Sequence, residues 1–263
     1  MTKTETVPPA AHSGEPPRQL RRLGSLLKEI AFVVIGALIV SSLLRFFVGQ
    51  MFVIPSDSMN NTLLPGDKVI VQKITDFQRG DIVVFADPGG WLPLEERDPP
   101  GTLRRGLELV GVLPDISTEH LIKRVIGMPG DRVICCDAQE RITVNGQALN
   151  EESYLYQDST GTVTAPSETK FEVVVPKDRI FVMGDYRDVS ADSRCHLSDV
   201  STTEKKGMVA FVRTDLVVGP AFAIAVPFSR TARLSRPETF AQVPGPSAPA
   251  PAEAVIKPAG VTC

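Results

Sequence analysis

The chain has 263 residues and a formal net charge of −3, which suits one medium-sized domain with appended segments. This weak negative charge excludes the basic field that is typical of nucleic-acid-binding proteins. Three histidines and four cysteines, with no CxxC pair among them, argue against a structural zinc site. We therefore expect no metal, no cofactor and no nucleic-acid partner.

The N-terminal part of the chain predicts a membrane anchor. Residues 1–25 are polar and Pro-rich and predict a disordered cytoplasmic tail. Residues 30–44 carry no charge, and extending this run past Arg45 gives the length of about 20 residues that a bilayer requires. We assign the anchor to residues 26–48.

The flanks of the anchor predict its orientation. Four basic residues precede it, so the positive-inside rule keeps the N-terminus in the cytoplasm and places the rest of the chain outside: Arg18, Arg21, Arg22 and Lys28. The protein is then a single-pass protein of the plasma membrane. A cleaved signal peptide is the alternative, but the region before the span is long and no small-x-small site follows closely.

From residue 49 onward, short β-branched stretches alternate with Gly, Pro and Asp turns, which predicts a mainly β domain. The predicted strands are 68–73, 81–85, 120–126, 132–136, 141–144, 171–175 and 179–183. Residues 88–119 interrupt this pattern and are interpreted as an insertion. The Pro- and Ala-rich residues 230–263 predict a disordered tail, so the folded domain spans 49–229.

The stretch IPSDSMNNTLLPGD places Ser56 and Ser58 directly after the predicted span. A serine hydroxyl becomes an effective nucleophile only when a base removes its proton. Histidine is the usual base, but nothing in the spacing of His120 or His196 supports a triad. A neutral lysine is the other candidate, and burial among apolar groups would have to lower its pKa from about 10.4.

Lys123 is the lysine that best fits this requirement. In HLIKRVIG, strand alternation puts Lys123 on one face with Leu121 and Val125. The same alternation would bury Arg124 on the opposite face. An edge strand with a solvated Lys and Arg explains the pattern equally well, so the residues alone leave both interpretations open.

Residues 184–194, GDYRDVSADSR, are dense in hydrogen-bonding groups. Two arginines among them argue against a calcium loop. A buried ion-pair network that shapes a site is favoured over a charged surface loop. Cys195, which follows directly, either pairs with Cys135 or Cys136 or stays a free buried thiol.

Three segments together resemble one family, the bacterial type I signal peptidases (leader peptidases), which are membrane-anchored Ser–Lys endopeptidases of the S26 type. PSDSMNNTL is similar to P-S-x-S-M-x-P-T-L, KRVIGMPGD matches K-R-V-I-G-x-P-G-D, and GDYRDVSADSR is similar to G-D-N-R-D-x-S-x-D-S-R. The resemblance runs from the span to about Phe228. The single span, the Cys-Cys pair and the long insertion resemble the actinobacterial branch. The resemblance implies a catalytic domain of antiparallel sheets outside the cytoplasm.

The resemblance also implies roles for individual residues. Ser58 would be the nucleophile, Lys123 the general base, Ser56 an oxyanion donor with the Ser58 N–H, and Ser190 the group that orients the lysine. The pairs Asp185 with Arg187 and Asp192 with Arg194 would hold the shape of the site. Shallow pockets for small side chains would be lined by Phe52, Ile54, Met59, Leu63, Leu121 and Ile122.

The implied activity is removal of signal peptides after Ala-x-Ala sites. The partners would be preproteins exported by the Sec or Tat route, together with the lipid bilayer. Three residues depart from the family pattern: Asp57 stands where a small residue is usual, Asn61 replaces Pro, and Tyr186 replaces Asn or His. We expect Asp57 to face solvent, because an inward carboxylate would raise the pKa of Lys123. The alternatives are a catalytically inactive membrane-anchored homologue that acts as a binding protein, and a self-cleaving repressor-type peptidase, which the span disfavours.

Overall fold

The structure is a computed structural model that describes residues 18–47, 49–92, 101–102, 119–201 and 204–257. Within the first range it describes the side chains of residues 26–41 only. The predicted tail up to residue 17, most of the predicted insertion and residues 258–263 therefore lie outside the described residues.

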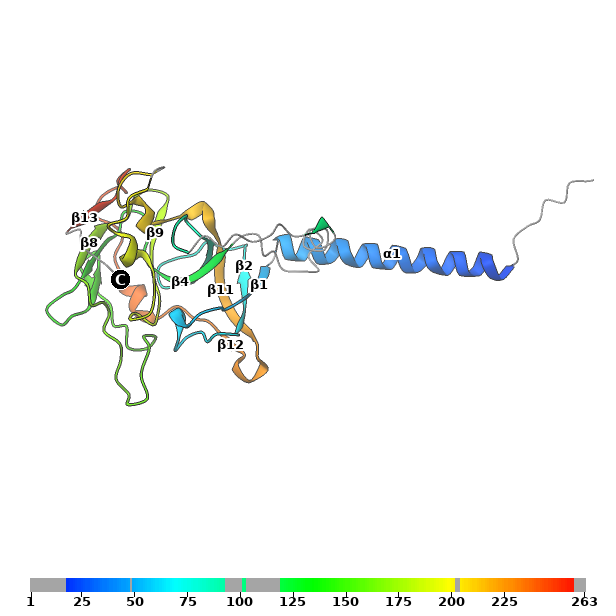
Figure 1. The fold of residues 1–263 in the computed structure, drawn as a ribbon, viewed down its shortest axis with the longest axis horizontal. Helices are drawn as coiled ribbons and strands as arrows, with labels where there is room; N and C mark the ends of the chain where they lie inside the picture. The colour runs from blue at the N-terminus through cyan, green and yellow to red at the C-terminus, as the bar shows by residue number, and fades with distance from the viewer. Residues whose placement is uncertain (1–17, 48, 93–100, 103–118, 202–203, 258–263) are drawn as a thin grey trace, which may run out of the picture.

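One long helix precedes the sheets. Helix α1 (Arg18–Phe47) begins within the stretch that we predicted to be disordered, directly after Pro16-Pro17 in the sequence. No proline interrupts the sequence of the helix, which favours a continuous element. In Figure 1, α1 projects from the end of the domain at which β1 and β2 lie. Of the residues whose side chains are described, no helical stretch has the length and apolarity of a membrane span.

Two antiparallel sheets are the main elements of the described chain after α1, which confirms the predicted mainly β fold. The larger sheet has the order β1-β2-β11-β3-β4-β9-β10, with β12 paired to β11, and the smaller has the order β13-β8-β5-β6-β7. The strands of the larger sheet are β1 (Gly49–Val53), β2 (Lys68–Gln72), β3 (Ile82–Ala86), β4 (His120–Gly127), β9 (Arg179–Met183), β10 (Val212–Arg213), β11 (Val217–Val226) and β12 (Ala232–Arg233). The strands of the smaller sheet are β5 (Arg132–Cys135), β6 (Ile142–Val144), β7 (Gln147–Ala148), β8 (Phe171–Val174) and β13 (Val255–Lys257).

Strand β11 was missed by the sequence analysis, although with ten residues it is the longest strand described. Its sequence VVGPAFAIAV contains Gly219-Pro220 and several alanines, which weaken a strand pattern. The pairing register shifts between Val217 and Gly219, so the ladder accommodates the glycine and proline at an irregularity. A Cβ at Gly219 would collide with the carbonyl oxygen of Gln72, which explains the glycine.

Buried apolar side chains form three clusters. The first lies between the two sheets, because it includes Val133, Ile142 and Phe171 of the smaller sheet and Phe181 of β9 in the larger sheet. The second and third lie on opposite faces of the larger sheet, because Ile82 and Ile122 belong to one while Val83 and Val125 belong to the other. Alternation along β3 and β4 therefore divides the core.

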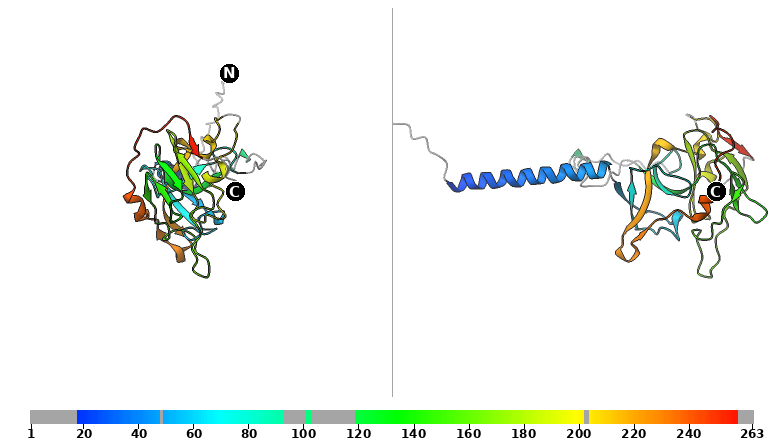
Figure 2. Two further views of the ribbon diagram at one scale, coloured as in Figure 1. Left: turned by 90° about the vertical axis from the view of Figure 1, so that its left-hand side faces the viewer. Right: turned by 180° about the vertical axis from the view of Figure 1, so that it is seen from behind.

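The predicted disorder of residues 230–263 is wrong as far as residue 257. This segment forms β12, the short helix η6 (Glu238–Gln242) and β13, and Phe240 is buried in the first cluster. Although this segment is rich in Pro and Ala, it contains a few apolar residues that are buried against the domain. In the left-hand view of Figure 2, the stretch that leads to β13 runs along the outside of the domain.

The cysteines follow neither expected alternative. Cys135 and Cys136, at the end of β5, are joined to each other by a disulfide. Cys195 is also disulfide-bonded, so it neither pairs with those two nor stays a free thiol.

Candidate active site

The predicted nucleophile lies on a tight turn between β1 and β2. The short helix η1 (Asp57–Met59) carries Ser58, whose side chain is 7% exposed. Backbone hydrogen bonds from Ile54 N to Asp67 O and from Gly66 N to Ile54 O, each 2.9 Å long, close the base of the turn. The turn therefore holds Ser58 in one place.

Lys123 reaches this serine from β4. Its Nζ donates a hydrogen bond to Ser58 Oγ at 2.5 Å, and the lysine is 4% exposed. Strand β4 pairs with β3 on one side and with β9 on the other. Lys123 is thus on an interior strand, which contradicts the alternative of a solvated edge strand.

Burial also changes the acidity of Lys123. Desolvation lowers the pKa of its ammonium group from 10.5 to about 8. The charge of Asp192 opposes this change and that of Arg194 adds to it. A substantial fraction of the lysine is therefore neutral near neutral pH.

The two other serines of the predicted site differ in their surroundings. Ser56 is exposed, and its hydroxyl donates to Ser58 Oγ at 3.4 Å, so it lies beside the predicted nucleophile. Ser190 is 4% exposed, but no described group forms a hydrogen bond with its Oγ. The predicted hydrogen bond from Ser190 to Lys123 is therefore absent from this structure, although a Cβ at Gly184 would collide with both Ser190 and the Ser58 carbonyl.

One of the two predicted ion pairs is present. Asp192 accepts hydrogen bonds from Arg194 Nε and Nη2, each at 2.9 Å, and from the N–H of Gly184 at 3.0 Å. Burial raises the pKa of Asp192, but the charge and hydrogen bonds of Arg194, the N–H of Gly184 and the charge of Lys123 together hold that pKa below the usual value. Asp192 thus stays ionised close to Lys123.

The other predicted pair, Asp185 with Arg187, is wrong. Asp185 binds Arg124, whose Nε and Nη2 donate at 2.8 and 2.6 Å, and Arg187 Nη2 donates to Glu151 at 2.5 Å. All four side chains are buried, so each charge has its counter-charge in the interior. The pairing was carried over from the family resemblance, and the motif does not show that each of these residues has its partner in a distant part of the chain.

Several supporting residues were missed or only partly found. Alternation did predict that Arg124 is buried, and its guanidinium carbon lies 4.3 Å from the centre of the Tyr154 ring. Glu151 gave no signal, because it stands in a polar stretch without periodicity. Thr62, which donates to Asp185 at 2.5 Å, is visible in the sequence only as part of the family motif.

Four of the six predicted pocket residues share one buried cluster, and a fifth packs against it. Ile54, Met59, Leu63 and Ile122 belong to the second cluster, with Phe52 beside them. Leu121 packs against the third cluster, on the opposite face of β4. Alternation along the strand separates it from its neighbour Ile122.

Two residues that depart from the family pattern are accommodated. Asp57 is exposed and is not among the charges that shift the pKa of Lys123, so it faces solvent as we predicted. Asn61 has φ of 87°, a left-handed conformation that proline cannot adopt and asparagine tolerates. Its side-chain amide donates to the carbonyl of Leu155 at 2.9 Å.

His196 has a structural environment rather than a place beside Ser58. Its Nδ1 lies 2.6 Å from Asp199 Oδ2, and its ring stacks on Trp91 with centroids 4.5 Å apart. Trp91 is itself buried and packs edge-on against Phe85. The structure therefore offers Lys123, and not His196, as the partner of Ser58.

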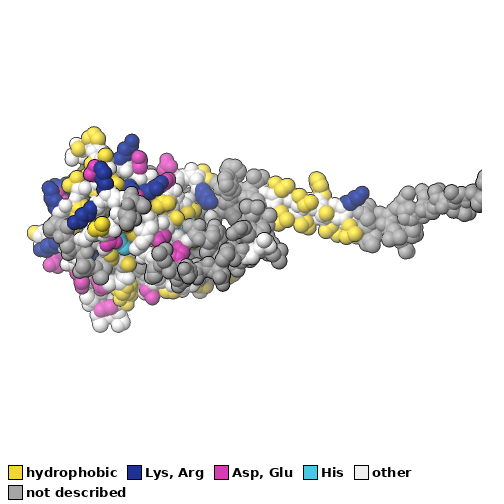
Figure 3. All heavy atoms as spheres, turned by 45° about the horizontal axis from the view of Figure 1, so that its top comes forward, with side chains coloured by type: hydrophobic (Ala, Val, Ile, Leu, Met, Phe, Trp, Pro, Cys, Tyr) yellow, Lys and Arg dark blue, Asp and Glu magenta, His cyan; other side chains and the backbone are white. Residues whose placement is uncertain are grey.

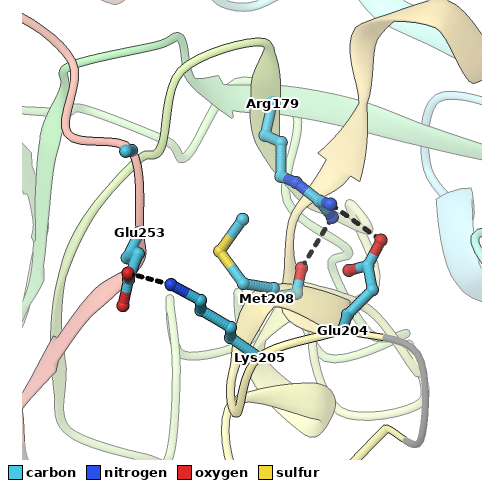
Figure 4. A pocket seen from close by; sticks show the side chains of 6 residues that line it. Arg179, Glu204, Lys205, Met208 and Glu253 are labelled. Carbon is cyan, nitrogen blue, oxygen red and sulfur yellow. Dashed lines mark hydrogen bonds and ion pairs between the residues drawn. The ribbon is translucent and has the colours of Figure 1, made fainter.

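Another pocket lies among β9, the 204–208 loop and the segment before β13 (Figure 4). Its volume is about 350 Å³, and its lining includes Arg179, Glu204, Lys205, Met208 and Glu253. Arg179 pairs with Glu204, and Lys205 pairs with Glu253, so opposite charges meet within it. None of its lining residues belongs to the predicted site. Across the described part of the chain, no three His, Cys, Asp or Glu side chains are grouped as metal ligands.

An antiparallel β domain with a buried Ser–Lys pair is the arrangement of a serine hydrolase whose base is a lysine. The family model described as signal peptidase, peptidase S26, matches residues 27–226. The chain belongs to this family of serine endopeptidases, which confirms the resemblance seen in its motifs.

Curated relatives agree with this assignment. Signal peptidase I of Mycobacterium tuberculosis is 32% identical over 241 residues, which cover 84% of this chain and 79% of that protein. Signal peptidase I of Pseudomonas fluorescens is 31% identical over 219 residues, which cover 76% and 72%. The crystal structure of a signal peptidase I from Enterococcus faecalis V583 matches with 19% identity and a TM-score of 0.29, over 56% of this chain and 97% of that one. Structural similarity at this level does not bear on the fold.

Proposed function

We propose that this protein removes N-terminal signal peptides from exported preproteins, and that it cuts after Ala-x-Ala sites with Ser58 as nucleophile and Lys123 as general base. The observation that carries the proposal is the 2.5 Å contact between Lys123 Nζ and Ser58 Oγ, both of them buried. The membership of the signal peptidase family supplies the substrate class.

The proposed reaction begins with a proton transfer. Neutral Lys123 accepts the proton of the Ser58 hydroxyl while Oγ attacks the carbonyl carbon of the scissile bond. The lysine then returns the proton to the leaving amine as the C–N bond breaks, which leaves the signal peptide as an ester on Ser58. A water molecule, deprotonated by the same lysine, attacks this ester, and the lysine returns the proton to Ser58 Oγ as the ester bond breaks and the signal peptide is released.

The developing oxyanion needs hydrogen-bond donors. The Ser58 N–H and the Ser56 hydroxyl are our candidates, because Ser56 Oγ lies 3.4 Å from Ser58 Oγ on the open side of the turn. One such donor is commonly worth about 3 kcal/mol in the transition state. We therefore propose that Ser56 acts on the rate rather than on the fold.

The preference for alanine follows from the apolar cluster beside Ser58. Ile54, Met59, Leu63 and Ile122 are each at most 5% exposed, so little space is open between them. Small side chains fit such shallow surfaces, and large ones would have to displace packed core residues. We propose this cluster, with Phe52, as the wall that selects small residues before the cleaved bond.

We also propose that α1 anchors the enzyme in the plasma membrane, with the catalytic domain outside the cytoplasm and substrates that arrive by the Sec or Tat route. Hydrophobic side chains cover most of the face of α1 that Figure 3 shows over the described residues. Phe32 is 81% exposed and Val33 67%, an exposure of apolar surface that water would penalise and lipid would not. Protease treatment of intact spheroplasts tests this topology: the domain should be degraded from outside while a tag before residue 18 is protected.

The activity is tested with the purified full chain in detergent and a preprotein that carries an Ala-x-Ala site. Intact masses should show cleavage after the second alanine, and Lys123→Met and Ser58→Ala should each abolish it. Lys73→Met, at an exposed lysine, is the matched control and should cleave normally. Cleavage that survives Lys123→Met would overturn the lysine base. Absence of cleavage by the unaltered protein would favour the inactive homologue that acts as a binding protein.

A further inference from the structure

Two tyrosines are stacked next to the turn that carries Ser58. The ring centroids of Tyr156 and Tyr186 are 3.9 Å apart, and the ring planes are inclined by 22°. Both side chains are half-buried, so part of the stack is open to solvent. Neither ring belongs to one of the three apolar clusters. We call this pair the tyrosine platform.

Backbone hydrogen bonds fix the platform relative to Ser58. Tyr186 N donates to the carbonyl of Ser58, and Tyr156 N donates to the carbonyl of Asp185, both at 3.1 Å. The Asn61 amide, on the same turn as Ser58, donates to the residue before Tyr156 at 2.9 Å. Three segments far apart in the sequence are thereby joined, and the platform cannot move independently of Ser58.

Two exposed carboxylates flank the platform. Asp57 immediately precedes Ser58, and Asp188 follows Tyr186 by two residues. Burial raises the pKa of Tyr186, and the charges of Asp188 and Asp57 raise it further, so both carboxylates act on this ring. No described cation pairs with either of them, and among the described residues the carboxylate of Asp57 accepts a hydrogen bond from the side-chain amide of Asn60 at 3.5 Å. Within the described residues, these two carboxylates therefore have no cationic partner.

The platform adjoins Ser58 and is separate from the apolar cluster that we propose for selecting alanine. The apolar cluster proposed for the residues before the cleaved bond comes from β1, β4 and the turn, and it leaves the platform free. When the residues before the bond occupy that cluster, the platform is left as a surface next to Ser58 for the residues that follow the bond. The faces of tyrosine rings attract cations, and nearby carboxylates strengthen that attraction.

We propose that Tyr156 and Tyr186, together with Asp57 and Asp188, form a subsite that favours Lys or Arg in the first two residues after the cleaved bond and disfavours Asp or Glu there. This inference rests on the proposed function, because it concerns the substrate of the same site. It assigns a role to two of the residues that depart from the family pattern, Asp57 and Tyr186.

The test uses the purified full chain and three peptides with one Ala-x-Ala site. They differ only in the two residues after the cut, which are Lys, Gln or Glu. We expect kcat/KM for the Lys peptide to exceed that for the Glu peptide roughly tenfold at low ionic strength. The ratio should decrease in 0.5 M salt, because exposed charges are screened over distances of a few ångströms.

Variants identify the groups responsible. The double variant Asp57→Asn, Asp188→Asn should reduce the Lys-to-Glu ratio to about twofold or less. Tyr186→Leu should reduce it in part, because it removes the ring and keeps both charges. Asp76→Asn, at an exposed aspartate on another loop, is the control and should leave the ratio unchanged.

The outcomes separate the two proposals. If the Gln peptide is cleaved but the Lys and Glu peptides differ by less than twofold, the subsite is wrong and the proposed function stands. A ratio that persists in the double aspartate variant would also overturn the subsite. If the unaltered protein cleaves none of the three peptides, the proposed function fails and the subsite fails with it.

Discussion

A change of pH across the pKa of Lys123 should switch the enzyme between an inactive and an active form. With a pKa of about 8, half of the amine is neutral at that pH, roughly one part in ten at pH 7 and one in a hundred at pH 6. Because the base must be neutral, kcat/KM should fall about tenfold for each pH unit below 8 and should level off above it. The perturbation needs no mutation.

The assay measures kcat/KM between pH 5.5 and 10 at constant ionic strength, with a peptide that has no titratable group near its cleavage site. A midpoint close to 10.5 would show that Lys123 is not desolvated as the structure indicates. A midpoint close to 6.5 would point to a histidine instead. A profile that is flat from pH 6 to 9 would refute a lysine base altogether.

The same pKa implies a cost for folding. Below pH 8 both the folded and the unfolded chain hold the proton of Lys123, and the cost of burying the charge is fully present. Between pH 8 and 10.5 the unfolded chain binds more protons, so stability rises with pH and the cost disappears. The difference between 10.5 and about 8 corresponds to about 3 kcal/mol. Lys123→Met should therefore raise the free energy of unfolding at pH 7 and much less at pH 10, as urea denaturation can measure.

Three further variants test the surroundings of the site. Asp192→Asn should move the midpoint of the pH profile below 8, because Asp192 is the main charge that raises the pKa of Lys123; a higher midpoint would contradict this. Glu151→Gln should lower the free energy of unfolding by about 3–5 kcal/mol, because it leaves a buried guanidinium without its counter-charge, whereas Glu152→Gln, at an exposed position, should be neutral in the same urea titration. Asn61→Pro should destabilise by more than about 1 kcal/mol although proline fits the family pattern, because φ is 87° here, and an unchanged melting temperature would refute that reasoning.

The sequence predicted the positions of the strands better than it predicted which strands and which charged residues pair with one another. All seven strands that we expected are present within one or two residues at each end. Alternation raised the possibility that Lys123 and Arg124 are both buried, and both are. It could not tell whether their strand is interior or at an edge, because the answer depends on pairing with β3 and β9, which lie about 40 and 60 residues away in the sequence.

Ion pairs between residues that are distant in the sequence could not be predicted from the local pattern either. Asp192 and Arg194 are two residues apart and do pair, so nearness in sequence was sufficient there. Asp185 instead pairs with a residue 61 positions away, and Arg187 with one 36 positions away. Nothing in the local pattern specifies such partners. The segment after residue 230 was misjudged for a related reason: a proline-rich composition limits regular structure, but a single aromatic ring can still be held by the domain.

The position of β13 at the end of the smaller sheet affects the order in which that sheet can be assembled during synthesis. β13 pairs with β8 and so covers what would otherwise be an outer strand of the smaller sheet. An uncovered strand offers its peptide groups to other chains and invites aggregation. Since this cover comes from residues 255–257, a chain that is synthesised from its N-terminus contains the other four strands of the smaller sheet before β13 can cover β8. Between the synthesis of β8 and that of β13, the uncovered edge of β8 can pair with other chains. A chaperone or rapid translocation would protect the chain from aggregation during this interval.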